Sequence, residues 1–156
     1  MAKIDQVAEH VKILRERLVE KVPGHFGIKH IITAFFGALF FGFSFMLSSL
    51  LFQVSLALTH QDLMLITVAT WLILSAEIYF VGYTRVPDPT KRPFGQFWAK
   101  RILTYYFIAL FVSFMLITLY GLPKFAPGTE NVFKLVIAIS FPAAVGAAVS
   151  DLLGKY

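Results

Sequence analysis

Residues 102–122 read ILTYYFIALFVSFMLITLYGL, a stretch without a charged side chain that directly follows Lys100 and Arg101. An α-helix needs about 20 mostly apolar residues to cross the hydrocarbon core of a bilayer, so this stretch predicts a transmembrane helix. Three further stretches meet the same criterion: 28–58, 63–83 and 132–153. The first is longer than one span requires, and we expect tilt or a cytoplasmic extension of the helix to absorb the excess.

The composition agrees with a membrane protein. Of the 156 residues, 58% are hydrophobic and only 15% are charged, with a mean hydropathy of +0.73. Soluble domains are roughly 45–50% apolar. Ordinary soluble, collagen-like and disordered chains are therefore excluded, and the absence of cysteine excludes a secreted disulfide scaffold. We predict an all-α polytopic membrane protein with four transmembrane helices.

The net charge of +5 would suggest nucleic acid in a soluble chain, but the positions of the charges indicate topology instead. Of the 14 Lys and Arg residues, only Lys124 and Lys134 lie near the connection between spans three and four, and residues 59–62 between spans one and two carry none. The positive-inside rule then places both termini in the cytoplasm. Because topology accounts for most of the basic residues, we expect no nucleic-acid partner. The first twenty residues are charged throughout, so we also expect no cleavable signal peptide.

Residues 1–23 predict a separate cytoplasmic amphipathic helix that ends at Pro23 and Gly24. Its apolar residues recur at helical spacing on one narrow seam: Ile4, Val7, Val11, Leu14 and Leu18. The helix could form a short coiled coil or lie on the inner leaflet. The narrow seam and the mixed charges favour packing against another helix.

An internal duplication is visible in the remaining domain, 24–156. Residues 24–40, GHFGIKHIITAFFGALF, align without gaps on residues 95–111, GQFWAKRILTYYFIALF. We predict two hairpin repeats, 24–86 and 95–156, that are parallel and related by an axis along the membrane normal. Each repeat would carry a basic pair where its first helix begins, Lys29-His30 or Lys100-Arg101, and one acid near the end of its second helix, Glu77 or Asp151.

Glu77 is the acid that lies well inside a span, where an ionised carboxylate costs a few kcal/mol unless it is paired, hydrated or protonated. One interpretation is an acid that binds a proton or a cation. The other is a structural salt bridge to Lys29, Lys100 or Arg101. Asp151 lies near a helix C-terminus, where the helix dipole disfavours an anion. We therefore expect Asp151 to pair with Arg101 or Lys100.

Other polar and small residues of the spans have weaker signals. Gln53 and Ser49 are candidates to line the outer half of an ion pathway, although hydroxyls in membrane helices usually bond to their own backbone. Two rows of small residues predict close helix packing, and Pro142 predicts a kink or hinge. The packing and hinge candidates are Ala38, Gly42, Pro142 and Gly146.

No cofactor, metal or catalytic motif is present in the sequence. Its four histidines have no metal-ligand spacing, and phosphate-binding, zinc-protease, paired-cysteine and dinucleotide motifs do not occur. We therefore expect a protein that is not an enzyme and that holds neither a metal nor a cofactor.

Several motifs carry a resemblance to a known family. They are GALFFG at 37–42, ExxFVGYTR at 77–85, KRI at 100–102 and SFPAAVGAAVSDLL at 140–153. Over about residues 25–153 the chain resembles a family of prokaryotic integral membrane proteins that share a domain of unknown function (DUF2391-like). The resemblance implies the cytoplasmic membrane of a bacterium or an archaeon, but it implies neither an activity nor site residues.

The leading functional hypothesis is a small oligomeric ion channel or ion/proton-coupled transporter in the lipid bilayer. Glu77 would be the acid in the pathway, with Asp151 as its pseudo-equivalent, and a proton or an inorganic cation would be the ligand. Because four helices leave little central room and the small-residue faces invite packing, we expect a homo-oligomer. The alternative is a non-enzymatic scaffold or partner subunit that assembles through its N-terminal helix and those faces.

Overall fold

The computed structural model describes residues 27–85 and 94–153, so the helix predicted over 1–23 lies outside the described residues. The described part is helical and contains no strand: α2 (Ile28–Met46), α3 (Ser49–Ala57), α4 (His60–Glu77), α5 (Phe94–Leu119) and α6 (Thr129–Leu153). Four segments of this described part are long and apolar enough to cross a membrane: Ile28–Met46, His60–Gly82, Phe94–Leu119 and Thr129–Leu153. The predicted four-span, all-α architecture is confirmed.

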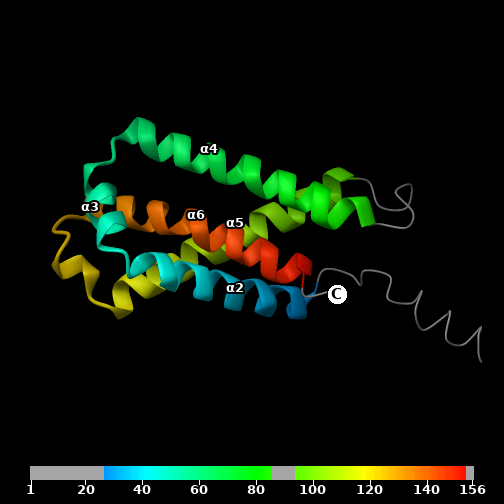
Figure 1. Ribbon diagram of the computed structural model, residues 1–156, viewed down its shortest axis with the longest axis horizontal. Helices are drawn as coiled ribbons and strands as arrows, with labels where there is room; N and C mark the ends of the chain where they lie inside the picture. Colours follow the sequence, from blue (N-terminus) through cyan, green and yellow to red (C-terminus); the bar gives the residue numbers. More distant parts are fainter. Residues whose placement is uncertain (1–26, 86–93, 154–156) are drawn as a thin grey trace, which may run out of the picture.

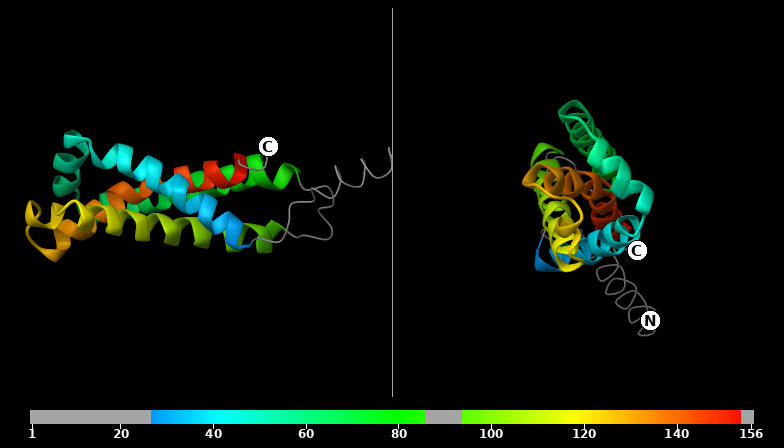
Figure 2. Two further views of the ribbon diagram at one scale, coloured as in Figure 1. Left: turned by 90° about the horizontal axis from the view of Figure 1, so that it is seen from below. Right: turned by 90° about the vertical axis from the view of Figure 1, so that its left-hand side faces the viewer.

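The first predicted span is two helices. Helix α2 ends at Met46, and Ser48 adopts extended backbone angles (φ −77°, ψ 113°) while its hydroxyl accepts a hydrogen bond from the Leu51 amide. This serine caps a new helix, α3, which lies across the end of the bundle (Figure 2). The expected tilt or cytoplasmic extension was therefore wrong. The 19 residues of α2 cover about 28 Å, close to the thickness of a bilayer core.

At the end of the bundle where α3 lies, local side-chain and backbone features mark the start of α4 and the end of α5. Thr59 and Asp62 form a reciprocal capping box at the start of α4, in which each side chain accepts a hydrogen bond from the other residue's amide. Gly121 follows α5 with φ +68°, a left-handed conformation that favours glycine and stops the helix.

Helix α6 is the central element of the bundle. It packs against α2, α5 and α4, and Figure 1 shows it between α4 and α2. Helices α2 and α5 begin, and α4 and α6 end, at the same end of the bundle (Figure 2). We call this end the basic end, because Lys29, His30, Lys100 and Arg101 lie there.

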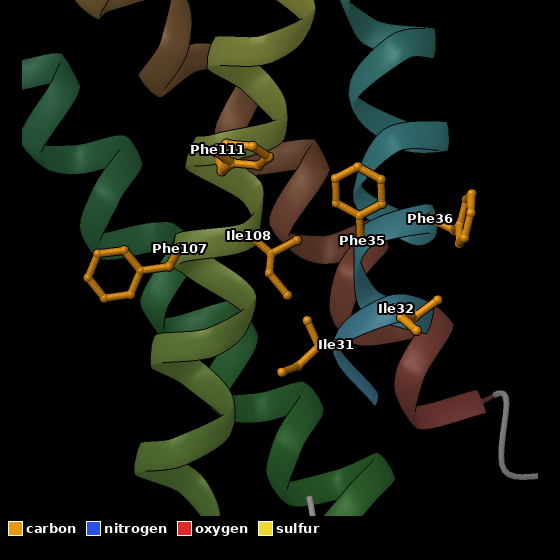
Figure 3. Close-up of a pocket in the computed structure, with 7 residues that line it drawn as sticks. All are labelled: Ile31, Ile32, Phe35, Phe36, Phe107, Ile108 and Phe111. Carbon is orange, nitrogen blue, oxygen red and sulfur yellow. The ribbon is translucent and has the colours of Figure 1, made fainter. Parts of the chain in front are cut away.

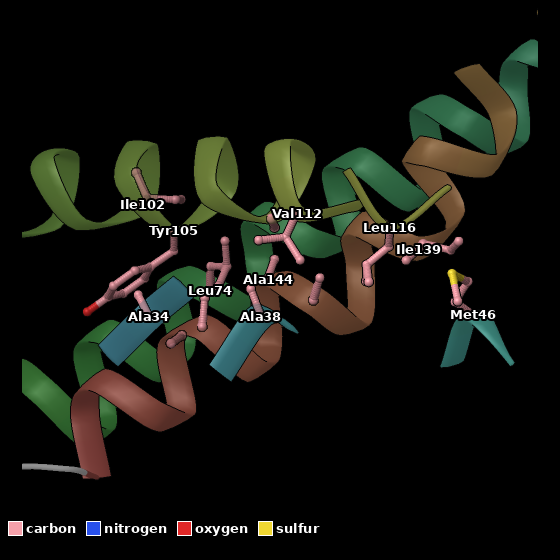
Figure 4. Close-up of a cluster of buried hydrophobic side chains, with 14 of the residues drawn as sticks. Ala34, Ala38, Met46, Leu74, Ile102, Tyr105, Val112, Leu116, Ile139 and Ala144 are labelled. Carbon is pink, nitrogen blue, oxygen red and sulfur yellow. The ribbon is translucent and has the colours of Figure 1, made fainter. Parts of the chain in front are cut away.

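The core is built from small residues where α2 meets α6. Ala34 and Ala38 of α2 are fully buried beside larger side chains such as Leu74 and Val112 (Figure 4). Gly37 of α2 and Gly146 of α6 lie at a close approach of the two backbones. A Cβ atom on Gly37 would collide with the Gly146 carbonyl oxygen, and one on Gly146 would lie 2.6 Å from the Gly37 carbonyl oxygen.

The predicted packing residues Ala38, Gly42, Pro142 and Gly146 are all buried within one chain. Helix α6 stays helical on both sides of Pro142. The outer surface carries large apolar side chains instead, for example Phe40 at 70% exposure, as expected for a surface that faces lipid. Because the small-residue rows are used inside the bundle, they no longer support the expected homo-oligomer.

Candidate functional site

A buried polar cluster joins three spans at the basic end. Asp151, in the last turn of α6, is only 2% exposed. One of its carboxylate oxygens accepts a hydrogen bond from His30 Nδ1 of α2 at 2.6 Å. The other contacts Arg101 Nη1 at 3.0 Å and accepts the Tyr105 hydroxyl at 2.5 Å, both from α5. The cluster therefore ties α2, α5 and α6 together at one carboxylate.

Arg101 is held from several sides. Its side chain is 3% exposed, and Nη1 also donates to the Tyr105 hydroxyl at 2.9 Å. The guanidinium lies over the Phe97 ring, 4.4 Å from its centroid, which adds a cation–π contact. Phe97, Arg101 and Tyr105 are spaced by four residues, so they share one face of α5.

The cluster satisfies a carboxylate in a place that is unfavourable for an anion. Both burial and the C-terminal end of the α6 dipole disfavour a negative charge. The arginine supplies the opposite charge, and the histidine and the tyrosine donate further hydrogen bonds. A buried pair completed in this way holds its helices in register, and losing one partner leaves an uncompensated charge.

In each basic pair of the predicted repeats, one residue faces the core and the other is exposed. Their second members, His30 and Arg101, both turn inward and meet Asp151. Their first members, Lys29 and Lys100, are exposed and form no ion pair with a described carboxylate. Adjacent residues of a helix point about 100° apart, so only one member of each pair can face the core. The prediction that these lysines neutralise an acid is not met within the described residues.

Glu77 has the opposite environment from Asp151. It is partly buried in the last turn of α4, and its Oε2 atom is buried without a hydrogen-bond partner among the described residues. Trp71 and Ser113 carry the other two such atoms in the described part, so Glu77 is the ionisable group among them. A π-helical turn, η1 (Ile78–Gly82), follows Glu77 directly, and such turns often occur at functional sites.

The position of Glu77 on α4 explains why no cation from α5 reaches it. Leu74 and Ile78 are fully buried, so they mark the face of α4 that packs on the core. On one flank of this face, Ser75 accepts a hydrogen bond from Trp98 Nε1 of α5 at 2.9 Å. Glu77 follows Ser75 by two residues and lies about 200° around the helix. It is therefore on the flank away from Lys100 and Arg101.

The other pathway candidates lie far from Glu77. Gln53 and Ser49 are exposed on α3, at the opposite end of the bundle. The 18 residues of α4 separate the two ends by about 27 Å. The structure thus brings Asp151 together with Arg101, and it does not bring Glu77, Asp151, Gln53 and Ser49 into one site.

Tyr105 and the inward role of His30 were missed by the sequence reasoning. His30 was noticed only as part of a basic pair. A signal was present, because Arg101 and Tyr105 are four residues apart on one helix and Tyr105 is a polar residue in an apolar stretch. Within the described residues no group of three His, Cys, Asp or Glu side chains could hold a metal ion.

Comparison with known proteins gives one match. The family model described as "Putative integral membrane protein (DUF2391)" matches residues 9–153. No curated protein and no solved structure matches the chain.

Proposed function

The chain belongs to this DUF2391 family of integral membrane proteins, and we propose that it carries protons or small cations across a prokaryotic cytoplasmic membrane, with Glu77 as the group that takes them up. The basic end faces the cytoplasm in this proposal, so that both termini are cytoplasmic, in keeping with the positive-inside rule. The protein acts without a cofactor and is not an enzyme.

The observation that carries the proposal is the unpartnered carboxyl oxygen of Glu77. An acid inside a membrane span needs a proton, water, a cation or a salt-bridge partner, and no described residue forms a salt bridge with Glu77. Asp151 has no such vacancy, because His30, Arg101 and Tyr105 occupy its two oxygens. We therefore assign Asp151 a structural role and propose Glu77 as the acid of the pathway.

The position of α6 decides where such a pathway can run. This helix fills the centre of the bundle, whereas α4 is the least buried of the four spans. The proposal therefore places the pathway along α4 and not along the axis of one bundle. It keeps a homo-oligomer because the poorly buried α4 is a face that a second subunit would cover, and not because of the small-residue rows. Gln53 and Ser49 remain candidates for the outer mouth, because α3 leads directly into α4.

Flux through reconstituted protein tests this function. In liposomes that hold the full-length chain, we expect proton or potassium flux from the wild type and a fall to the level of protein-free liposomes in Glu77→Gln. Glu130→Gln is the matched control, because Glu130 is a 64% exposed acid at the other end of the bundle. Its flux should equal that of the wild type.

A second candidate function is a non-enzymatic scaffold. The observation in its favour is that α6 fills the centre of the bundle and that a pocket on the outer surface is lined only by apolar residues. Folded wild-type protein without flux, or equal flux in Glu77→Gln, would contradict transport through Glu77, and the first of these results would favour the scaffold.

A further inference from the structure

An apolar groove runs between α2 and α5 on the outer surface of the bundle. Its volume is about 480 Å³, within the roughly 300–1,000 Å³ typical of ligand sites. Figure 3 shows Ile31 and Ile108 facing each other across it, with aromatic rings on both sides. All of its lining residues are isoleucine or phenylalanine: Ile31, Ile32, Phe35, Phe36, Phe107, Ile108 and Phe111.

The groove leads toward two exposed lysines at the basic end. Lys29 precedes Ile32 and Phe36 at the i, i+3, i+7 spacing of one helical face, and Lys100 precedes Phe107 and Phe111 at i, i+7, i+11. Each lysine therefore lies at the basic end of the helix face that carries these rim residues, and Figure 3 shows Phe36 and Phe107 on the outer sides of α2 and α5. Both lysines are exposed, and neither pairs with a described carboxylate.

We propose that this groove binds an anionic phospholipid, with one acyl chain between α2 and α5 and the headgroup at the basic end, where Lys29 and Lys100 attract its phosphate. The chemistry fits at both ends, because an isoleucine and phenylalanine surface suits a hydrocarbon chain and a lysine pair suits a phosphate. Basic sites between spans are a known means of binding anionic headgroups. The inference is independent of Glu77, which lies on α4.

The positive charges of Lys29 and Lys100 also disfavour a second copy of this chain as the occupant of the groove. In a two-fold dimer the same patch of both subunits meets. Packing through this groove would bring Lys29 and Lys100 of one copy against the same residues of the other, and like charges in contact disfavour such an interface. An anionic lipid neutralises these charges instead.

Lipid selectivity measured by native mass spectrometry tests the site. The full-length chain in detergent is offered equal amounts of dioleoylphosphatidylglycerol and dioleoylphosphatidylcholine. We expect the wild type to retain phosphatidylglycerol in preference to phosphatidylcholine. In Lys29→Gln/Lys100→Gln the ratio of the two retained lipids should fall by about tenfold or more, because two positive charges near the membrane surface are removed. Lys124→Gln is the matched control, because this exposed lysine lies on η3 (Leu122–Lys124) at the other end.

A groove-filling variant tests the chain-binding part separately. Ile108→Trp should reduce retention of both lipids, because the larger side chain occupies the space between α2 and α5. Equal retention of the two lipids by the wild type, an unchanged preference in the double lysine variant, or unchanged retention in Ile108→Trp would overturn the proposal. A wild-type dimer that Ile108→Trp abolishes, without lipid selectivity, would assign the groove to a second copy and overturn it too.

Discussion

Asp151→Asn is expected to lower the free energy of unfolding by about 3 kcal/mol or more, because it leaves the buried Arg101 without its counter-charge. The substitution keeps the shape of the side chain but removes the charge that faces Arg101 at 3.0 Å. It also weakens the bonds from His30 and Tyr105. Unfolding in detergent, followed by the fluorescence of the two tryptophans, measures the loss.

Glu130→Gln is the control for this effect. It also breaks an ion pair, between Glu130 and Lys134 at 2.9 Å, but Glu130 is 64% exposed. Exposed pairs contribute about 0–1 kcal/mol, so the change should be small. The double variant Arg101→Gln/Asp151→Asn should recover part of the stability, because it removes both charges together. A loss in Asp151→Asn as small as that in Glu130→Gln would contradict a structural role for the cluster.

Gly37→Ala is expected to destabilise the bundle by about 3 kcal/mol, at the upper end of the usual cost of overpacking. The new Cβ atom would collide with the carbonyl oxygen of Gly146. A backbone atom of a central helix cannot turn aside as a flexible side chain can, so α2 and α6 must separate along part of their length.

Gly95→Ala makes the same chemical change but is not expected to destabilise the bundle. Gly95 lies in the first turn of α5, and a Cβ atom there meets nothing within 4 Å. Alanine is favoured over glycine in a helix by up to about 1 kcal/mol, so this variant should be as stable as the wild type or more stable. Equal unfolding midpoints for Gly37→Ala and Gly95→Ala would refute the close contact of α2 with α6.

The spans could be predicted from the sequence because length and hydropathy suffice for a transmembrane helix. The break in the first span at Ser48 could not be predicted from the sequence. A serine in an apolar helix usually bonds to its own backbone, so it does not by itself indicate a helix end. Ser44, four residues earlier, does this by donating to the Phe40 carbonyl. Only the extended backbone at Ser48 distinguishes a cap from such a bond.

The candidate site was predictable in part. Reasoning from the helix dipole pointed to a cation at Asp151, and Arg101 lies there. The sequence offered Glu77 a salt bridge to Lys29, Lys100 or Arg101, but the structure brings one residue of each basic pair to Asp151 and no described basic residue to Glu77. Spacing along one helix identifies a shared face, whereas the choice between two acids depends on how α2, α5 and α6 pack. Only one member of the close glycine pair was predicted. Gly146 belongs to a predicted row of small residues, whereas Gly37 does not.

The central claim is that the two carboxylates have different roles, with Asp151 structural and Glu77 available for a proton or a cation. The unfolding midpoint of Glu77→Gln in detergent tests it most directly. Because Glu77 has no ion-pair partner among the described residues and one of its oxygens is buried without a hydrogen bond, removing its charge should leave the midpoint unchanged or raise it. A fall as large as that in Asp151→Asn would show that Glu77 is held by a structural partner and would contradict the claim.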